Sequence, residues 1–256
     1  MNIVREPRVY LVGRQVVEQA AVDGFLDDHG LAWTTDTEVG AEQLCEAAGR
    51  LCYMSFGKGR KNHAEYMAHI LESAHGSVLE HAVWNFVITG VSRSFTHELV
   101  RHRAGFGYSQ LSQRYVDETT ADFIEPDCIA ADPALHAIWL AAIEQAHQAY
   151  VRLVEGLQRH FAGEPDPTLR RKLARQAARS VLPNATETKI FVTANARALR
   201  HFIEARANEH AEVEIRRVAV KVLRIMQQEA PSLFGDYELV PLPDGTAIVR
   251  TPHRKV

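Results

Sequence analysis

The segment Glu98-Leu-Val-Arg-His-Arg-Ala-Gly-Phe-Gly-Tyr-Ser-Gln-Leu-Ser-Gln-Arg114 is the densest polar stretch of this 256-residue chain. It contains three arginines, one histidine, two serines and two glutamines, and two glycines flank Phe106. Arginine binds phosphate through paired N–H donors, glycine lets the backbone approach a ligand, and Ser and Gln add neutral hydrogen bonds. The part from Arg101 to Arg114 therefore favours a site for an anion attached to a heterocycle, although a helix end with a solvated basic face has the same composition.

The composition fits one globular domain spanning residues 1–256. Apolar residues make up 46% of the chain and charged residues 24%, the proportions of a chain that buries a core. The formal net charge of −3 argues against a general positive field for nucleic acid or an anionic membrane, so any attraction to phosphate must be local. Three cysteines, with no signal-like or membrane-spanning run, predict a soluble cytoplasmic protein with reduced thiols.

Hydrophobic spacing along the chain predicts an α/β fold with helix in excess. Apolar residues recur at helical spacing in stretches that we expect to be helices: 42–54, 62–74, 92–102, 133–161, 168–180, 196–207 and 209–230. Runs rich in β-branched and aromatic residues predict strands over 9–13, 83–89, 121–126 and 188–193. The tail from Tyr237 onward is rich in Pro and Gly, and we expect it to be peripheral.

Basic residues form two further clusters downstream of the polar segment. The first places three arginines at intervals of four on one helix face: Arg171, Arg175 and Arg179. In isolation this cluster fits a solvated basic face better than a ligand site. The second cluster follows a predicted strand, where its asparagine can cap the next helix, and it consists of Asn195, Arg197, His201 and Arg206. Surface salt bridges are the alternative explanation for it.

Histidines upstream of the segment raise the alternative of a metal-dependent hydrolase. They follow one another at intervals of six: His63, His69, His75 and His81. This spacing does not place two histidines on one helical turn, as a His-Glu-x-x-His site requires, so we predict no metal site. No cysteine lies in a polar cluster, and no glycine-rich nucleotide motif of the Walker or dinucleotide type is present.

The polar segment also resembles a known signature. Arg101-His102-Arg103, followed by Ser112-Gln-Arg114, is similar to the signature of the flavin-dependent thymidylate synthases, the ThyX family. The resemblance extends over roughly residues 60–215, and its other parts keep the family's order and spacing: His75-x-Ser77, Glu80-His81, Arg179-Ser-Val-Leu-Pro183, Asn195-Ala-Arg197, His201 and Arg206. It implies a single-domain α/β fold with a mixed sheet and surrounding long helices.

The resemblance implies two sets of ligand-binding residues. FAD would be held by His75, Ser77, Arg101, His102, Arg103, Gln110, Asn195, Arg197 and His201. The uridylate nucleotide would be held by Glu98, Leu99, Val100, Arg101, Gln110, Leu111, Ser112, Arg114, Arg179 and Arg206. Arg206 matches the family's catalytic arginine, which is held to favour ionisation of the uracil at N3.

The family implies the remaining reactants as well. Its members use 5,10-methylenetetrahydrofolate as carbon donor and NADPH to reduce FAD, and they are homotetramers whose active sites mix residues from several subunits. The C5 atom of uracil is a poor nucleophile, and no cysteine is placed here to add to C6. Activation therefore falls to a cationic arginine on the pyrimidine carbonyls. We assign Ser112 to phosphate binding, because no general base is evident beside it.

The signature departs from the family pattern in its loop. Eight residues, 104–111, separate Arg-His-Arg from Ser112, where the family has seven, and Gly107 stands where close relatives usually carry Ser. A longer, more pliable loop would make room for a ribose 2′-hydroxyl, so that UMP is methylated as well as dUMP. The chain then looks like the C5-methylases of pyrimidine-nucleoside antibiotic pathways, such as that for polyoxin.

Three alternatives stay open at this point. Neutral drift would leave an ordinary thymidylate synthase that is specific for dUMP. A non-enzymatic nucleotide-binding or nucleic-acid-binding protein would use the arginines as a continuous basic face, with strong salt dependence. The metal-dependent hydrolase would use the upstream histidines.

Overall fold

The computed structural model describes residues 1–60 and 62–256. Its α-helices are α1 (Gln19–Asp28), α2 (Gly40–Cys52), α3 (His63–Glu72), α4 (Arg93–Leu99), α5 (Asp127–Ala130), α6 (Pro133–His160), α7 (Pro167–Ala178), α8 (Ala196–Arg206), α9 (Val213–Glu229) and α10 (Pro231–Phe234). Short 3-10 helices are η1 (Gly76–His81), η2 (Glu118–Thr120) and η3 (Arg179–Val181). The strands are β1 (Ile3–Val4), β2 (Arg8–Arg14), β3 (Val83–Ser92), β4 (Phe106–Gln110), β5 (Phe123–Ile124), β6 (Glu187–Asn195), β7 (Glu238–Pro241) and β8 (Ala247–Arg250).

The strands form one four-stranded sheet and two pairs. The sheet has the order β2-β3-β6-β4, β1 pairs with β5 in parallel, and β7 pairs with β8 antiparallel. This mixture of sheet and abundant helix confirms the predicted α/β class. Among the described residues, no helix is long and apolar enough to cross a membrane.

The chain divides into two compact units, each built from separate stretches. Unit 1 consists of Met1–Arg8, Ile88–Leu99 and Ser109–Ile190. Unit 2 consists of Val9–Val87, Val100–Tyr108 and Phe191–Val256. The division into two units does not test the expectation that residues 1–256 form a single domain, which stays a prediction.

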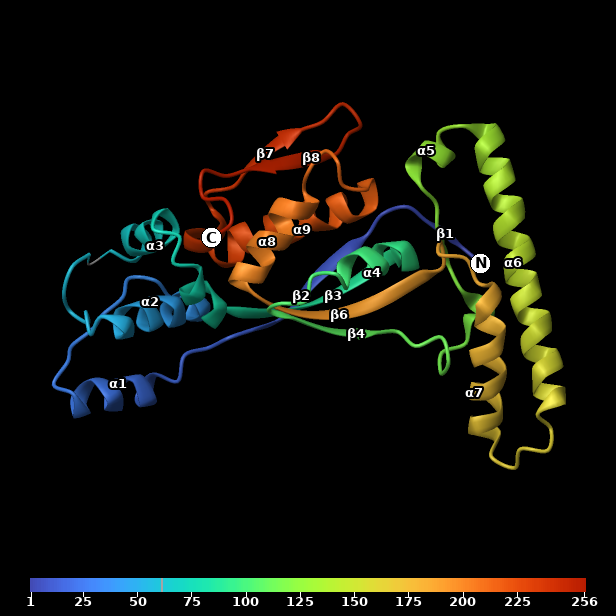
Figure 1. Cartoon of the computed structure of the whole chain (residues 1–256), viewed down its shortest axis with the longest axis horizontal. Coiled ribbons are helices and arrows are strands. Elements are labelled where there is room, and N and C mark those ends of the chain that lie inside the picture. Colours follow the sequence, from blue (N-terminus) through green and yellow to red (C-terminus); the bar gives the residue numbers. More distant parts are fainter. Residues whose placement is uncertain (61) are drawn as a thin grey trace. The chain divides into compact units, whose positions relative to one another are not determined.

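Unit 1 is organised around the hairpin of α6 and α7, which run side by side (Figure 1). Both helices begin in the same way, with an aspartate side chain that accepts from first-turn N–H groups and a proline at the first helical position. Apolar residues at helical spacing on α6 then face two small cores. One contains Phe123 and Ile143, and the other contains Tyr150, Val154 and Ala178.

Unit 2 contains the larger set of packed helices, with η1 packed against α2, α3 and α8. Its most deeply buried side chains include Met67, Trp84 and Phe234, and the last two meet edge to face. The C-terminal hairpin of β7 and β8 lies beside α8 and α9 (Figure 1). The tail is buried at its two ends, since Tyr237 is 4% exposed and Val256 is 5% exposed, but residues 238–255 are exposed or only partly buried, as expected of a peripheral segment. The apolar residues of the hairpin complete the cover of the two helices.

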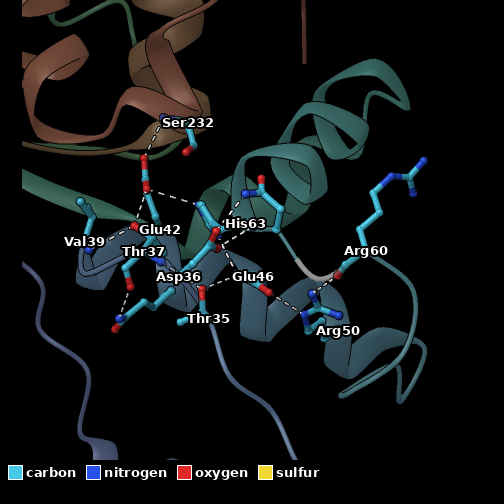
Figure 2. Close-up of polar contacts among 12 residues, drawn as sticks. Thr35, Asp36, Thr37, Val39, Glu42, Glu46, Arg50, Arg60, His63 and Ser232 are labelled. Carbon is cyan, nitrogen blue, oxygen red and sulfur yellow. Dashed lines mark hydrogen bonds and ion pairs between the residues drawn. The ribbon is translucent and has the colours of Figure 1, made fainter.

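A buried charged cluster joins α2 to α3 in unit 2 (Figure 2). The imidazole of His63 lies 2.7 Å from a carboxylate oxygen of Glu46 and 3.3 Å from one of Glu42. Glu46 also accepts from Arg50 at 2.7 Å, and the Arg50 guanidinium donates to three carbonyls of the following loop. Burial opposes the charge on His63, but its bonds to the two carboxylates outweigh burial and raise its pKa to about 9. His63, one of the four evenly spaced histidines, thus belongs to a structural ion cluster.

Candidate active site

Three stretches of unit 2 carry the residues expected to hold FAD, apart from Gln110. These stretches are the turn into η1, the segment from α4 to β4, and the start of α8. They bring into the same unit His75, Ser77, Arg101, His102, Arg103, Asn195, Arg197 and His201, together with Arg206 at the end of α8. Gln110 lies in unit 1. The three stretches are far apart in the sequence, so tertiary contacts must hold them together.

The first contact joins η1 to α8. Arg197 donates to the carboxylate of Glu80 at 2.6 Å, and both side chains are about half exposed. Gly76 approaches Arg197 closely, because a Cβ at that position would stand 2.8 Å from Nε of Arg197 and 2.7 Å from the backbone carbon of Val256. Only glycine permits this approach, which places the His75–Ser77 turn against α8.

The second contact joins the signature loop to the N-terminus of α8. The side chain of Asn195 accepts from the N–H of Ala198 at 2.8 Å, which caps the helix as expected. The backbone N–H of Asn195 donates to the carbonyl of Gly105 at 3.1 Å. Gly105 has a φ of +72°, and a Cβ there would stand 2.7 Å from Nδ2 of Asn195. Glycine at this position therefore allows the loop to rest on the helix cap.

The third contact involves the middle residue of Arg-His-Arg. His102 is buried, whereas its neighbours Arg101 and Arg103 are exposed. The Nε–H of Arg206 donates to Nε2 of His102 at 2.9 Å. Arg206, the residue expected to be catalytic, is thereby joined to the residues expected to bind the flavin.

Unit 1 carries most of the residues expected to bind the nucleotide. These are Glu98, Leu99, Gln110, Leu111, Ser112, Arg114 and Arg179, while Val100, Arg101 and Arg206 lie in unit 2. The amide of Gln110 donates to the hydroxyls of Thr96 and Thr188 at 3.1 and 3.3 Å. The backbone N–H of Leu111 donates to the carbonyl of Lys189 at 2.9 Å. The start of the Gln110–Arg114 turn is thus anchored to α4 and β6.

Arg93 is a member of this region that the sequence did not single out. Its guanidinium donates to the carbonyl of Leu111 at 2.9 Å, next to Ser112. Burial lowers the pKa of Arg93, and the nearby positive charge of Arg179 acts in the same direction, while Glu118 opposes both. The position of Arg93 at the start of α4, 18 residues before the carbonyl that it binds, gave no local signal.

One arginine of helix α7 departs from the interpretation of this cluster as a solvated face, whereas Arg171 and Arg179 are exposed as that interpretation expects. The side chain of Arg175 is 14% exposed, and it donates to the carbonyl of Tyr115 at 2.6 Å and to Asp117 at 2.8 Å. The exposed ring of Tyr115 lies under the ammonium of Lys172 and the guanidinium of Arg114. Lys172 lowers the pKa of the Tyr115 phenol through a hydrogen bond and its charge. Unit 1 therefore gathers cations from the signature and from α7 around one turn.

The cysteines lie outside these stretches. All three are free, with Cys45 and Cys52 on α2 and Cys128 on α5. Burial raises the pKa of the Cys45 thiol to about 12, which suppresses the thiolate. Within residues 1–60 and 62–256, no group of three or more His, Cys, Asp or Glu side chains is arranged to hold a metal ion.

Comparison with known proteins identifies the family. The family model described as "Thymidylate synthase complementing protein" matches residues 35–232. This chain belongs to the flavin-dependent thymidylate synthase family. The flavin-dependent thymidylate synthase of Mycolicibacterium gilvum is 52% identical over 239 residues, which cover 92% of this chain and 95% of the relative. That of Mycobacteroides abscessus is 49% identical over the same coverage, and that of Corynebacterium efficiens is 48% identical over 240 residues, or 93% and 95% of the two chains.

Membership of this family confirms the resemblance drawn from the signature and the flavin-dependent methyltransferase class. The family uses FAD, with NADPH and methylenetetrahydrofolate as co-substrates. We therefore interpret the residues expected to bind FAD and those expected to bind the nucleotide as parts of a flavin-dependent enzyme.

Proposed function

We propose that this protein catalyses the reductive C5-methylation of a uridylate nucleotide. The one-carbon unit comes from 5,10-methylenetetrahydrofolate, and the reducing equivalents come from NADPH. The new C–C bond replaces the C5–H bond of uracil, whose hydrogen leaves as a proton. The observation that carries the proposal is the joining of three distant stretches of unit 2 by Glu80–Arg197, Asn195–Gly105 and His102–Arg206.

The residues of unit 2 fit a flavin dinucleotide. Arg101 and Arg103 are exposed, and Arg197 is about half exposed, so all three can offer paired donors to a diphosphate. Gly76 and Gly105 keep the backbone free of side chains where η1 and the loop meet α8. Further polar side chains of unit 2 that would hold the flavin are those of Asn195, His201, Ser77 and His75. A bound flavin, once reduced by NADPH, would supply the hydride that completes the methyl group.

Arg206 is assigned to activation of the pyrimidine. Its guanidinium is a cation with several N–H donors, so it can stabilise negative charge that develops on the uracil carbonyls as N3 ionises. The alternative route through a cysteine adduct at C6 lacks a suitable thiol, because Cys45 is buried and the other two cysteines lie on α2 and α5. Ser112, Arg114 and Arg179 are assigned to the nucleotide phosphate.

Purified protein tests this proposal directly. We expect a yellow protein that absorbs near ~450 nm, as oxidised flavin does, and that converts dUMP to dTMP when given methylenetetrahydrofolate and NADPH. Arg206→Ala should abolish methylation while flavin stays bound, and Arg224→Ala, at an exposed position on α9, is the matched control. A colourless protein that cannot be reconstituted with FAD, or full activity in Arg206→Ala, would overturn the proposal.

We further propose that UMP is accepted alongside dUMP, in the manner of the nucleoside-antibiotic C5-methylases. The support is the extra residue of the signature loop and the absence of crowding at Gly107, where an added Cβ would make only an ordinary van der Waals contact with Thr193 at 3.7 Å. Initial rates on UMP and dUMP decide between this and a dUMP-specific enzyme. Deletion of Gly107 should lower the UMP rate relative to the dUMP rate. If UMP is inert while dUMP turns over, the sugar proposal is lost and the thymidylate synthase remains.

A homotetramer with shared active sites is the assembly that we propose. Unpaired apolar side chains on α6 support an interface there, since Ile138 is 69% exposed and Leu135 is 47% exposed. Light scattering should give about four times the 28.7 kDa chain mass. Mixing inactive Arg206→Ala with inactive Arg114→Ala and refolding them together should restore activity if sites combine different chains. A mixture that stays inactive contradicts shared sites.

A further inference from the structure

The bond between Arg206 and His102 fixes the protonation state of the imidazole. The guanidinium of arginine carries only donors, so its Nε–H can bond to Nε2 of His102 only where that nitrogen presents a lone pair. The His102 imidazole must therefore be neutral, with its proton on Nδ1. The two residues are 104 positions apart, and the 2.9 Å contact ties the last residue of α8 to the signature loop.

Several groups hold this imidazole in place. The ring of Phe202 meets it edge to face, with centroids 5.2 Å apart, and the rings of His201 and Phe106 lie at 5.7 and 5.9 Å. The Tyr108 hydroxyl donates to the backbone carbonyl of His102 at 2.6 Å. His102 is only 8% exposed, so it is packed from α8 and from β4 together. An acceptor that is held so firmly can define the position of the group that it binds.

We propose that neutral His102 is the positioning residue for Arg206. The imidazole accepts from Nε and thereby sets the plane and direction of the guanidinium that acts on the uracil. Phe106 packs against the imidazole and Tyr108 binds the backbone carbonyl of His102, so the lengthened loop acts on Arg206 through His102. This inference rests on the proposed function, which gives Arg206 its role in activating the pyrimidine.

The positioning depends on pH, because a protonated imidazole has no lone pair to accept the Arg206 bond. The titratable and charged groups that face His102 include Arg206 and His201 from α8 and Tyr108 from β4, and Arg101 and Arg103 are its neighbours in the chain. Histidine gains its charge between about pH 5 and 8. Protonation would set two cations against each other and release Arg206. The turnover number kcat should therefore fall on the acid side while FAD stays bound.

Two substitutions at His102 separate positioning from packing. His102→Phe keeps a flat ring but removes the acceptor, and we expect kcat to fall about 10- to 100-fold, the range for a lost hydrogen bond to a charged group. His102→Gln restores a neutral acceptor, so it should recover most of kcat and lose the acid limb of the pH profile. His210→Gln, at an exposed histidine beyond the end of α8, is the control and should keep the acid limb. Each rate is measured at saturating dUMP and folate and divided by the flavin content read near ~450 nm.

The outcomes distinguish this inference from the proposed function. Wild-type protein that methylates no uridylate refutes the proposed function itself. Active wild-type protein whose His102→Phe variant keeps full kcat with FAD bound overturns the positioning role. If His102→Phe fails to fold or to bind flavin, the pH profile of His102→Gln decides, and an unchanged acid limb in that variant overturns the inference.

Discussion

Replacement of His63 should remove a large share of the stability of unit 2, and the loss should depend on pH. Folding raises the pKa of His63 to about 9, against an ordinary value of about 6.5. The gap corresponds to about 3 kcal/mol of free energy linked to protonation. Because the folded pKa is the higher one, this stabilisation is complete below about pH 6.5 and is lost as the pH rises through about 9. Net stabilities of domains are about 5–15 kcal/mol, so the loss is measurable.

The direct substitution gives a similar magnitude. His63→Ala removes the imidazole that contacts the buried carboxylates of Glu42 and Glu46. Arg50 still pairs with Glu46, but Glu42 loses its contact with His63. Removal of one partner of a buried ion pair costs about 3–5 kcal/mol. His63→Gln keeps a donor for Glu46 without the charge, and it should cost less. Glu46 shares these contacts, and despite burial they lower its pKa to about 2, so the two contributions are not additive.

Urea unfolding between pH 6 and pH 9.5 tests the argument. The difference in unfolding free energy between wild type and His63→Gln should be largest near pH 6 and should shrink as the pH approaches 9.5. His69→Ala is the control, because His69 lies on the same helix, α3, but is only partly buried. Its unfolding free energy should differ little from that of the wild type at every pH. If the difference in unfolding free energy between wild type and His63→Gln stays constant across this range, the reasoning is refuted. Such a result would mean that folding does not raise the pKa of His63.

Two further predictions concern glycine and arginine positions in unit 2. Gly105→Ala places a Cβ on a residue with φ +72°, 2.7 Å from Nδ2 of Asn195. The backbone strain should lower the free energy of unfolding by about 1–2 kcal/mol and reduce the flavin content, whereas Gly107→Ala should change neither. Equal flavin absorbance in the two variants would contradict this prediction. Arg200→Met leaves Asp236 without the buried guanidinium that binds it at 2.6 and 2.8 Å, and denaturant unfolding should show a loss of about 3–5 kcal/mol. The same change at exposed Arg224 should stay within about 0.5 kcal/mol, and a comparable loss at both positions would exclude the buried pair as the cause.

The long amphipathic helices were predictable from the sequence because their own residues specify them. Apolar spacing over 133–161 and 42–54 matches α6 and α2 to within two residues at each end. The region 92–102 was less well defined, since α4 ends at Leu99, and the helix expected from 209 begins at Val213. Helix ends depend on caps and on the path of the next segment, which hydrophobic spacing does not encode.

Elements that depend on distant partners were missed. Strand β4 lies inside the polar signature, where Phe-Gly-Tyr-Ser-Gln reads as a loop, and it exists because β6 pairs with it in the sheet. Helix α1 was also missed, since it buries only Leu26. The C-terminal hairpin had a usable signal, because Asp244-Gly245 lies between two short apolar runs and such a pair favours a hairpin turn.

The site was predictable as sets of residues but not as contacts. The signature and the family resemblance gave the residues of both groups, because those residue types recur in fixed order. Pairings such as Glu80–Arg197 and His102–Arg206 join positions 117 and 104 residues apart, and no periodic pattern links them. Arg93 was overlooked for the same reason, since its partner is a main-chain carbonyl that any residue could supply.

The position of the extra loop residue changes how an altered sugar preference should be understood. From the sequence, the longer loop was expected to be pliable and to make room for a 2′-hydroxyl. In the structure, Gly105 lies against Asn195, Phe106 and Tyr108 stack with each other, and both contact His102. The lengthened stretch is therefore anchored to the residues expected to bind the flavin and, through His102, to Arg206. A change in its length should then alter kcat on dUMP as well as on UMP, whereas simple widening of a sugar pocket would alter the UMP rate alone.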